Sequence, residues 1–184
     1  MNLDSVKSHY QACFERHGKT PHGMGWKDHD AQYVRFKALA ALWEEDRGSV
    51  NDWGCGDGSF GWWVDGKYVG YDISPRDLPV GEFILSDKPT QVADYTIASG
   101  IFNVRKEHSE AKWWDYICES IKVMRETSRK GFGFNILSVW CDRKDPELYY
   151  ARPFEVMTQC QRYSNRILFN HLYSPYDFTI LVHL

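Results

Sequence analysis

The chain has 184 residues, 43% of them hydrophobic and 16% aromatic, a composition typical of one globular domain with its own core. Its 22 basic and 25 acidic residues give a net charge of −3, which excludes a broad basic surface for nucleic acid or anionic membrane. A local basic patch stays open, and the many aromatic side chains are candidates to line a pocket.

Cysteine usage and the polar N-terminus indicate the cellular compartment. The five cysteines are scattered and contain no Cys-x-x-Cys pair, which favours neither a disulfide framework nor a zinc site. No apolar run approaches the roughly 18 residues of a membrane span, and no signal peptide is visible. We therefore expect a soluble, cytoplasmic protein with reduced thiols and no membrane partner.

The N-terminal quarter of the chain is predicted to form two helices joined by a loop. Apolar residues at helical spacing predict a helix over residues 3–17, and a second one over residues 31–43 with Asp30 as its cap. The segment between them, residues 17–30, is rich in glycine and predicted to be a loop. Because it also holds Trp26 and three histidines, we expect it to act as a lid over a bound substrate.

A strand followed by a glycine-rich turn is the main motif of the chain. The strand covers residues 50–53, and the turn, residues 54–58, has a glycine at every second position. Glycine adopts positive φ and lets a ligand touch the backbone, so this turn is suited to form the floor of a cofactor site. Asp52 precedes the turn, and the next strand, residues 67–71, leads to Asp72, which is placed to accept hydrogen bonds from ribose hydroxyls.

The glycines allow more than one interpretation. Gly56, Gly58 and Gly61 also fit the dinucleotide fingerprint, in which a helix N-terminus faces a pyrophosphate. S-adenosylmethionine instead presents an amino acid and a sulfonium, and Asp52 would bind its ammonium but repel a diphosphate. An ordinary strand–turn–helix would explain the glycines but not the two spaced acids.

The remaining elements alternate between strands and helices. Strands are predicted over residues 82–85, 93–99, 131–138, 166–172 and 178–183, and helices over residues 59–64, 109–128 and 154–163, with a helical turn after Ser74. The last two strands are close enough in sequence for an antiparallel hairpin. This alternation predicts an α/β protein with a doubly wound sheet and one reversed strand.

The sequence Asp52-x-Gly54-Cys55-Gly56-x-Gly58, followed by Asp72-Ile73-Ser74, resembles the class I S-adenosylmethionine-dependent methyltransferases of small-molecule type. The resemblance runs from Asp30 to the end of the chain. It implies a Rossmann-like, seven-stranded sheet of order 3-2-1-4-5-7-6 with helices on both faces. It also implies one domain over residues 1–184, with an N-terminal helical cap or lid (1–47) and a cofactor-binding core (48–184).

The resemblance further implies S-adenosyl-L-methionine as cofactor and S-adenosyl-L-homocysteine as product. Asp72 would bind the ribose, Ile73 would flank the adenine and Asp87 would accept its exocyclic amine, although Asp87 also fits a capped turn. Arg35 could reach the cofactor carboxylate or be an ordinary solvated arginine. The candidate cofactor-binding residues are Arg35, Asp52, Trp53, Gly54, Cys55, Gly56, Gly58, Asp72, Ile73, Asp87 and Ser99.

The segment after the fourth strand differs from part of the family. Ser99-Gly100-Ile101-Phe102-Asn103 stands where adenine- and amide-methylating enzymes carry an Asp/Asn-Pro-Pro-aromatic signature, so we do not expect those substrates. Phe102 is expected as a wall and Asn103 as a catalytic hydrogen-bonding group near the transferred methyl, with core and turn roles as the alternative. The predicted substrate-binding residues are Trp26, Phe102, Trp140, Tyr149 and Tyr150.

Methyl transfer from a sulfonium requires alignment of the acceptor and, for some acceptors, removal of a proton. A histidine is the natural base because its pKa lies near neutrality, and His22, His29 and His108 are the candidates, unless they are ordinary surface histidines. His17, His22 and His29 are too flexibly spaced to favour a metal site, so we expect no metal.

The predicted function is methyl transfer to an oxygen or nitrogen of a small molecule, such as a sugar, a glycolipid precursor or a secondary metabolite. The small-molecule substrate is the expected partner, and nucleic acid is not expected. A scaffold that binds S-adenosylmethionine without catalysis, and a protein or RNA methyltransferase, are the alternative hypotheses.

Overall fold

The computed structural model describes residues 1–43 and 48–184, which form a seven-stranded sheet of order β3-β2-β1-β4-β5-β7-β6. β1 pairs in parallel with β2 and β4, β2 with β3, and β4 with β5. β7 runs antiparallel to both β5 and β6. The predicted fold and strand order are confirmed. The predicted boundary between cap and core, at residue 47, lies outside the described residues.

The strands largely follow the expected positions. They are β1 (Val50–Trp53), β2 (Tyr68–Asp72), β3 (Glu82–Leu85), β4 (Ala93–Ser99), β5 (Ser128–Leu137), β6 (Arg166–Asn170) and β7 (Asp177–His183). β1, β3 and β4 begin and end at the predicted residues. β5 begins three residues earlier than predicted, because Ser128 already pairs with Ala93 across an irregularity in the ladder.

The helices are α1 (Asp4–His17), α2 (His29–Ala40), α3 (Glu110–Glu126) and α4 (Pro153–Gln161), with 3-10 segments η1 (His22–Met24), η2 (Ala41–Trp43) and η3 (Ser59–Trp63). Asp28 caps α2, since its carboxylate accepts the N–H of Ala31 at 2.8 Å, so the predicted cap Asp30 was wrong. The helical turn after Ser74 is absent, because Asp72 accepts the N–H of Ser74 and bends the chain. None of the described helices is long and apolar enough to cross a membrane.

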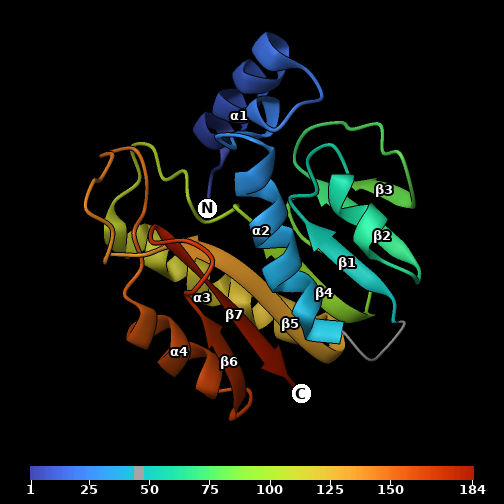
Figure 1. Cartoon of the computed structure of the whole chain (residues 1–184), viewed down its shortest axis with the longest axis vertical. Helices are drawn as coiled ribbons and strands as arrows, with labels where there is room; N and C mark the ends of the chain where they lie inside the picture. Colours follow the sequence, from blue (N-terminus) through green and yellow to red (C-terminus); the bar gives the residue numbers. More distant parts are fainter. Residues whose placement is uncertain (44–47) are drawn as a thin grey trace.

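Helices cover both faces of the sheet and bury a separate apolar cluster under each (Figure 1). On one face, Trp113 and Ile117 of α3 pack with Phe134 of β5, and all three side chains are fully buried. On the other face, Leu39 of α2 packs with Ile97 of β4. Burial of each such side chain contributes about 1.5–3 kcal/mol to the free energy of unfolding, so the two clusters fix the helices against the sheet.

α1 lies at one end of the molecule, next to the beginning of α2 and toward the carboxyl end of β1 (Figure 1). Its Val6 is buried in the cluster beneath α3, and the hydroxyl of Tyr10 donates to the carbonyl of Gly100 at 3.4 Å. The N-terminal helix is therefore packed over the edge of the sheet where the parallel strands end.

Candidate active site

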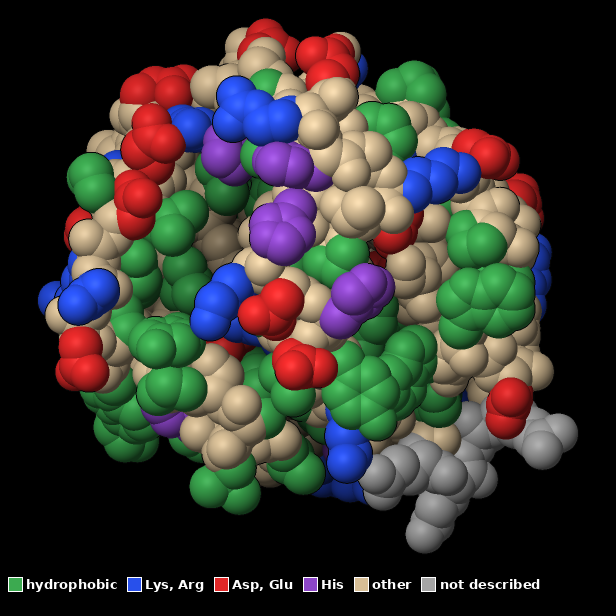
Figure 2. All heavy atoms as spheres, turned by 45° about the horizontal axis from the view of Figure 1, so that its top comes forward, with side chains coloured by type: hydrophobic (Ala, Val, Ile, Leu, Met, Phe, Trp, Pro, Cys, Tyr) green, Lys and Arg blue, Asp and Glu red, His purple; other side chains and the backbone are tan. Residues whose placement is uncertain are grey.

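A cavity of about 310 Å³ opens at the carboxyl ends of the parallel strands. Its walls come from the glycine turn, the ends of β2 and β4, the loop after β3, and α1, α2 and the loop between them. Figure 2 views the face that carries α1 and shows a hollow there, with histidine side chains gathered beside it. Ligands of open α/β sheets bind at this edge, so the cavity is the candidate site.

The glycine turn forms one wall of the cavity with its backbone. Gly54, Gly56 and Gly58 have φ of 77°, 56° and 75°, which only glycine adopts readily. A Cβ at Gly56 would stand 2.7 Å from Sδ of Met24, so the N-terminal loop lies directly on the turn. Gly54, Cys55 and Gly56 line the cavity, whereas Gly58 faces Leu78 and is not among its lining residues.

Asp72 links the glycine turn to the loop after β2. Its carboxylate accepts the N–H of Gly56 at 3.1 Å and that of Ser74 at 2.8 Å, and it lies 3.6 Å from Nε of Arg76. The side chains of Asp72 and Arg76 are only 10% and 7% exposed. Asp72 is thus an acceptor held at the cavity wall by two backbone donors and one guanidinium.

Two further predicted cofactor residues lie beside Asp72. Ile73 and Asp87 both line the cavity, and the Asp87 side chain is exposed at its rim. The backbone carbonyl of Asp87 accepts the indole N–H of Trp53 at 2.9 Å, so the loop after β3 is tied to the end of β1. Trp53 is 5% exposed and also contributes to the cavity wall.

Asp52 lies deepest in the acidic end of the cavity, with an exposed fraction of 2%. Its carboxyl accepts the hydroxyl of Tyr68 at 2.6 Å. Burial raises the pKa of Asp52 to about 7; the bond from Tyr68 opposes this, and the neighbouring Asp72 and Asp57 add to it. The Cys55 thiol beside it is also buried, which raises its pKa.

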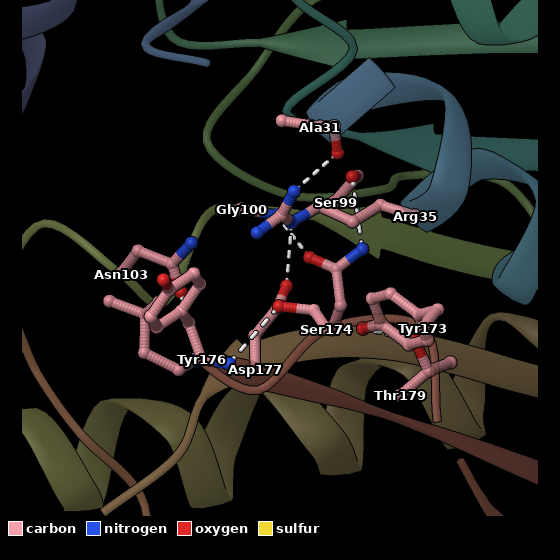
Figure 3. Close-up of polar contacts among 12 residues, drawn as sticks. Ala31, Arg35, Ser99, Gly100, Asn103, Tyr173, Ser174, Tyr176, Asp177 and Thr179 are labelled. Carbon is pink, nitrogen blue, oxygen red and sulfur yellow. Dashed lines mark hydrogen bonds and ion pairs between the residues drawn. The ribbon is translucent and has the colours of Figure 1, made fainter. Parts of the chain in front are cut away.

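Arg35 reaches from α2 into the opposite wall (Figure 3). Its Nε donates to Asp177 at 2.6 Å, a second N–H donates to the Ala31 carbonyl, and its guanidinium stacks on Trp26, with 4.9 Å from Cζ to the ring centroid. The side chains of Arg35 and Asp177 are 10% and 0% exposed. Arg35 is therefore a buried, paired cation that positions Trp26, not a solvated arginine.

The loop after β4 is fixed to β5 by two asparagines. Asn135 accepts the N–H of Gly100 at 3.0 Å and donates to Ser99 Oγ at 3.1 Å, whereas Asn103 accepts the N–H of Leu137 at 3.3 Å. Ser99 and Asn103 both line the cavity. The side-chain oxygen of Asn103 thus holds the loop against the end of β5.

The predicted histidines are not brought into the cavity. His22 and His29 are exposed and His108 stacks on Trp113 with 5.7 Å between ring centroids; none of the three is among the lining residues. His9 of α1 lines the cavity instead. Burial, and then the charge of Lys106, lower the pKa of His9, so its ring is neutral at neutral pH.

The predicted aromatic wall is also placed differently. Phe102 is fully buried against Phe134, and Tyr149 is in the same core cluster. Trp140 is 50% exposed, and the hydroxyl of Tyr150 accepts the N–H of Asp145 outside the cavity. The chain after β5 folds back on itself there, because the N–H of Val139 donates to the carbonyl of Ala151. Of the predicted substrate residues, only Trp26 lines the cavity in the described part of the chain.

Several cavity or cavity-supporting residues had no sequence signal that pointed to them: His9, Tyr10, Met24, Tyr68 and Arg76. The first three belong to the N-terminal segment, which carries no motif of its own. Tyr68 reads as an ordinary apolar residue of a buried strand. Among the described residues, no group of three or more His, Cys, Asp or Glu side chains could hold a metal ion.

Comparison with known proteins identifies the family. No protein-family model matches the chain. Over 152 residues, 73% of this chain and 92% of the relative, the chain is 35% identical to "Putative methyltransferase Rv1506c" of Mycobacterium tuberculosis.

Solved structures agree in fold. Over 98% of its length the chain superposes on 87% of the Burkholderia thailandensis 1,6-didemethyltoxoflavin-N1-methyltransferase, with a TM-score of 0.66 and 10% identity. It likewise superposes on human N-acetylserotonin methyltransferase with a TM-score of 0.63 and 13% identity, spanning only 59% of that longer chain. The curated relative, the strand order and the glycine turn agree: the chain belongs to the class I S-adenosylmethionine-dependent methyltransferases.

Proposed function

We propose that the protein transfers a methyl group from S-adenosylmethionine to an oxygen or nitrogen of a small-molecule acceptor. The observation that carries the proposal is a single cavity with two chemically different ends. One end has the glycine turn and the carboxylates of Asp52 and Asp72, and the other is enclosed by α1. A cofactor and an acceptor can therefore meet in one enclosure, as in-line displacement requires.

At the acidic end, each part of the cofactor has a matching partner. Asp72 would accept the ribose hydroxyls, Ile73 would flank the adenine, and Asp87 at the rim would accept the exocyclic amine. The backbone of the glycine turn would support the methionine portion. Asp52 would bind its ammonium, and Arg35 in the opposite wall would bind its carboxylate.

At the other end, the walls suit an acceptor with an apolar body. Leu3 and Val6 before and within α1, Ile101 and Val104 after β4, and Leu148 supply apolar surface. Pockets of this kind hold small molecules through apolar walls and a few placed polar groups. A glycolipid precursor or secondary metabolite fits these walls better than an unmodified sugar does.

Two polar side chains stand within the apolar end. Asn103 would hold the acceptor, and His9, whose pKa is lowered, would take a proton from its hydroxyl or amine. The N-terminal segment would act as a lid, since Met24 and Trp26 lie against Gly56 and Gly100. Residues 1–184 would then work as one domain, with the lid completing the site.

The test uses S-adenosylmethionine labelled in its methyl group, incubated with the protein and with separate small-molecule, protein and RNA fractions. The proposal predicts label in the small-molecule fraction and none without enzyme. Label in the protein or RNA fraction would identify a macromolecular acceptor instead. Binding of the cofactor without transfer to any fraction would indicate a non-catalytic scaffold.

A further inference from the structure

Asp52, in the wall of the cavity, forms a buried hydrogen-bonded pair with Tyr68. We propose that Tyr68 is a positioning residue that holds Asp52 for the cofactor ammonium, and that cofactor binding expels a proton from Asp52 into solvent. The inference rests on the proposed function, because it takes the ammonium of S-adenosylmethionine or S-adenosylhomocysteine as the partner of Asp52.

The surroundings of Asp52 make its charge costly before the cofactor arrives. The titratable groups that face it are Tyr68 of β2, Cys55 and Asp57 of the turn, and Asp72, with Arg76 behind. Three carboxyls therefore share one guanidinium, and that guanidinium lies against Asp72. Burial and the two neighbouring carboxyls raise the pKa of Asp52 to about 7, so this carboxyl is partly protonated near neutral pH.

The hydrogen bond from Tyr68 stabilises the ionised form of Asp52. Its side chain is buried, and its hydroxyl donates at 2.6 Å to Asp52 Oδ2, the sole hydrogen bond to this carboxyl among the described residues. β2 fixes that geometry, since Val50 and Tyr68 are direct partners in the β1–β2 ladder. The bond holds one carboxyl oxygen in the wall and leaves the other for a ligand.

The proton balance follows directly. In the free protein, part of Asp52 is the neutral acid; an arriving ammonium favours the carboxylate, so the O–H bond of Asp52 breaks and the proton goes to the buffer. Binding should therefore strengthen as the pH rises through about 7, until Asp52 is fully ionised. The cofactor amine loses its own proton at higher pH in every variant alike, so differences between variants isolate Asp52.

Calorimetry with S-adenosylhomocysteine, between pH 6 and pH 8 in two buffers of different ionisation enthalpy, measures affinity and proton release together. The wild type should release close to one proton at pH 6 and almost none at pH 8. Tyr68→Phe should weaken binding about tenfold at pH 7, because a hydrogen bond to a charged acceptor is lost. The pH at which the affinity levels off should rise by about one unit. Asp52→Asn should release no proton.

Tyr71→Phe is the matched control, since the Tyr71 hydroxyl is buried on the same strand and has no hydrogen-bond partner in the described structure. It should bind like the wild type. Binding by the wild type without proton release, or equal behaviour of Tyr68→Phe and Tyr71→Phe, would overturn the inference alone. Absence of any binding would overturn the proposed function as well. If Tyr68→Phe fails to fold, proton release by the wild type against Asp52→Asn decides.

Discussion

At the scale of single residues, Asp52 shows how a buried carboxyl can lower the stability of the folded protein. Its pKa is about 7 in the folded chain and about 3.9 when unfolded, so between these values the folded state binds more protons. Stability therefore falls as the pH rises through this window. Asp52→Asn removes the cost, and we expect it to raise Tm by a few degrees at pH 8 but to change it little at pH 4.

Thermal unfolding at the two pH values checks this prediction. Asp142→Asn, which alters an exposed carboxylate outside any helix or strand, serves as control and should leave Tm unchanged at both. An equal shift for Asp52→Asn at pH 4 and pH 8 would mean that the amide changes packing, and that Asp52 does not titrate in the folded protein.

His9 is the residue on which proton removal depends in the proposed function. His9→Gln should slow methyl transfer about a hundredfold, the usual contribution of a general base, without changing the affinity for S-adenosylhomocysteine. His22→Gln is the matched control, since His22 is exposed and outside the cavity. Unchanged transfer by His9→Gln at every pH would remove His9 from the mechanism; parallel losses of transfer and affinity would make its role structural.

At the scale of elements, the contact between the N-terminal loop and the loop after β4 would hold the proposed lid closed. Gly100 has φ 88°, and a Cβ there would stand 2.9 Å from the Trp26 ring. Gly100→Ala should displace Trp26, increase proteolytic cleavage of the N-terminal segment and weaken S-adenosylhomocysteine binding about tenfold.

Gly18→Ala provides the control for backbone strain, because Gly18 has φ 63° and open space around its missing side chain. It should lower Tm but leave the affinity within about twofold. If both alanine variants lose affinity alike, strain and not the contact with Trp26 is responsible.

Elements bounded by clear breakers were predictable from the sequence. β1, β3 and β4 are short strands followed at once by Gly54, by Ser86-Asp87 and by Gly100, and their bounds are correct. The cap of α2 was misassigned because Asp28 and Asp30 are chemically equivalent, and only the fold of the preceding loop selects Asp28. Trp140, Tyr149 and Tyr150 do not line the cavity because the loop after β5 pairs with Ala151, a tertiary contact with no local signal in the sequence.

At the scale of the whole molecule, the residues that line the glycine-turn end of the cavity could be located from the sequence, and those that line the end under α1 could not. The glycine turn and the two acids are contiguous with strand ends, whose meeting point follows from any parallel sheet. The acceptor end depends on α1, a separate helix placed by Val6 and Tyr10, so no strand-based argument locates His9. The strand order came from family resemblance, because strand spacing alone does not determine it.

The central claim is that this cavity binds the S-adenosyl cofactor, and calorimetry of the whole chain with S-adenosylhomocysteine and NAD tests it most directly. We expect saturable one-to-one binding of S-adenosylhomocysteine and none of NAD. Asp72→Asn should weaken the former about 10- to 100-fold, since each charge-assisted hydrogen bond contributes about 1.5–3 kcal/mol. Saturable binding of NAD with no response to S-adenosylhomocysteine would contradict the claim.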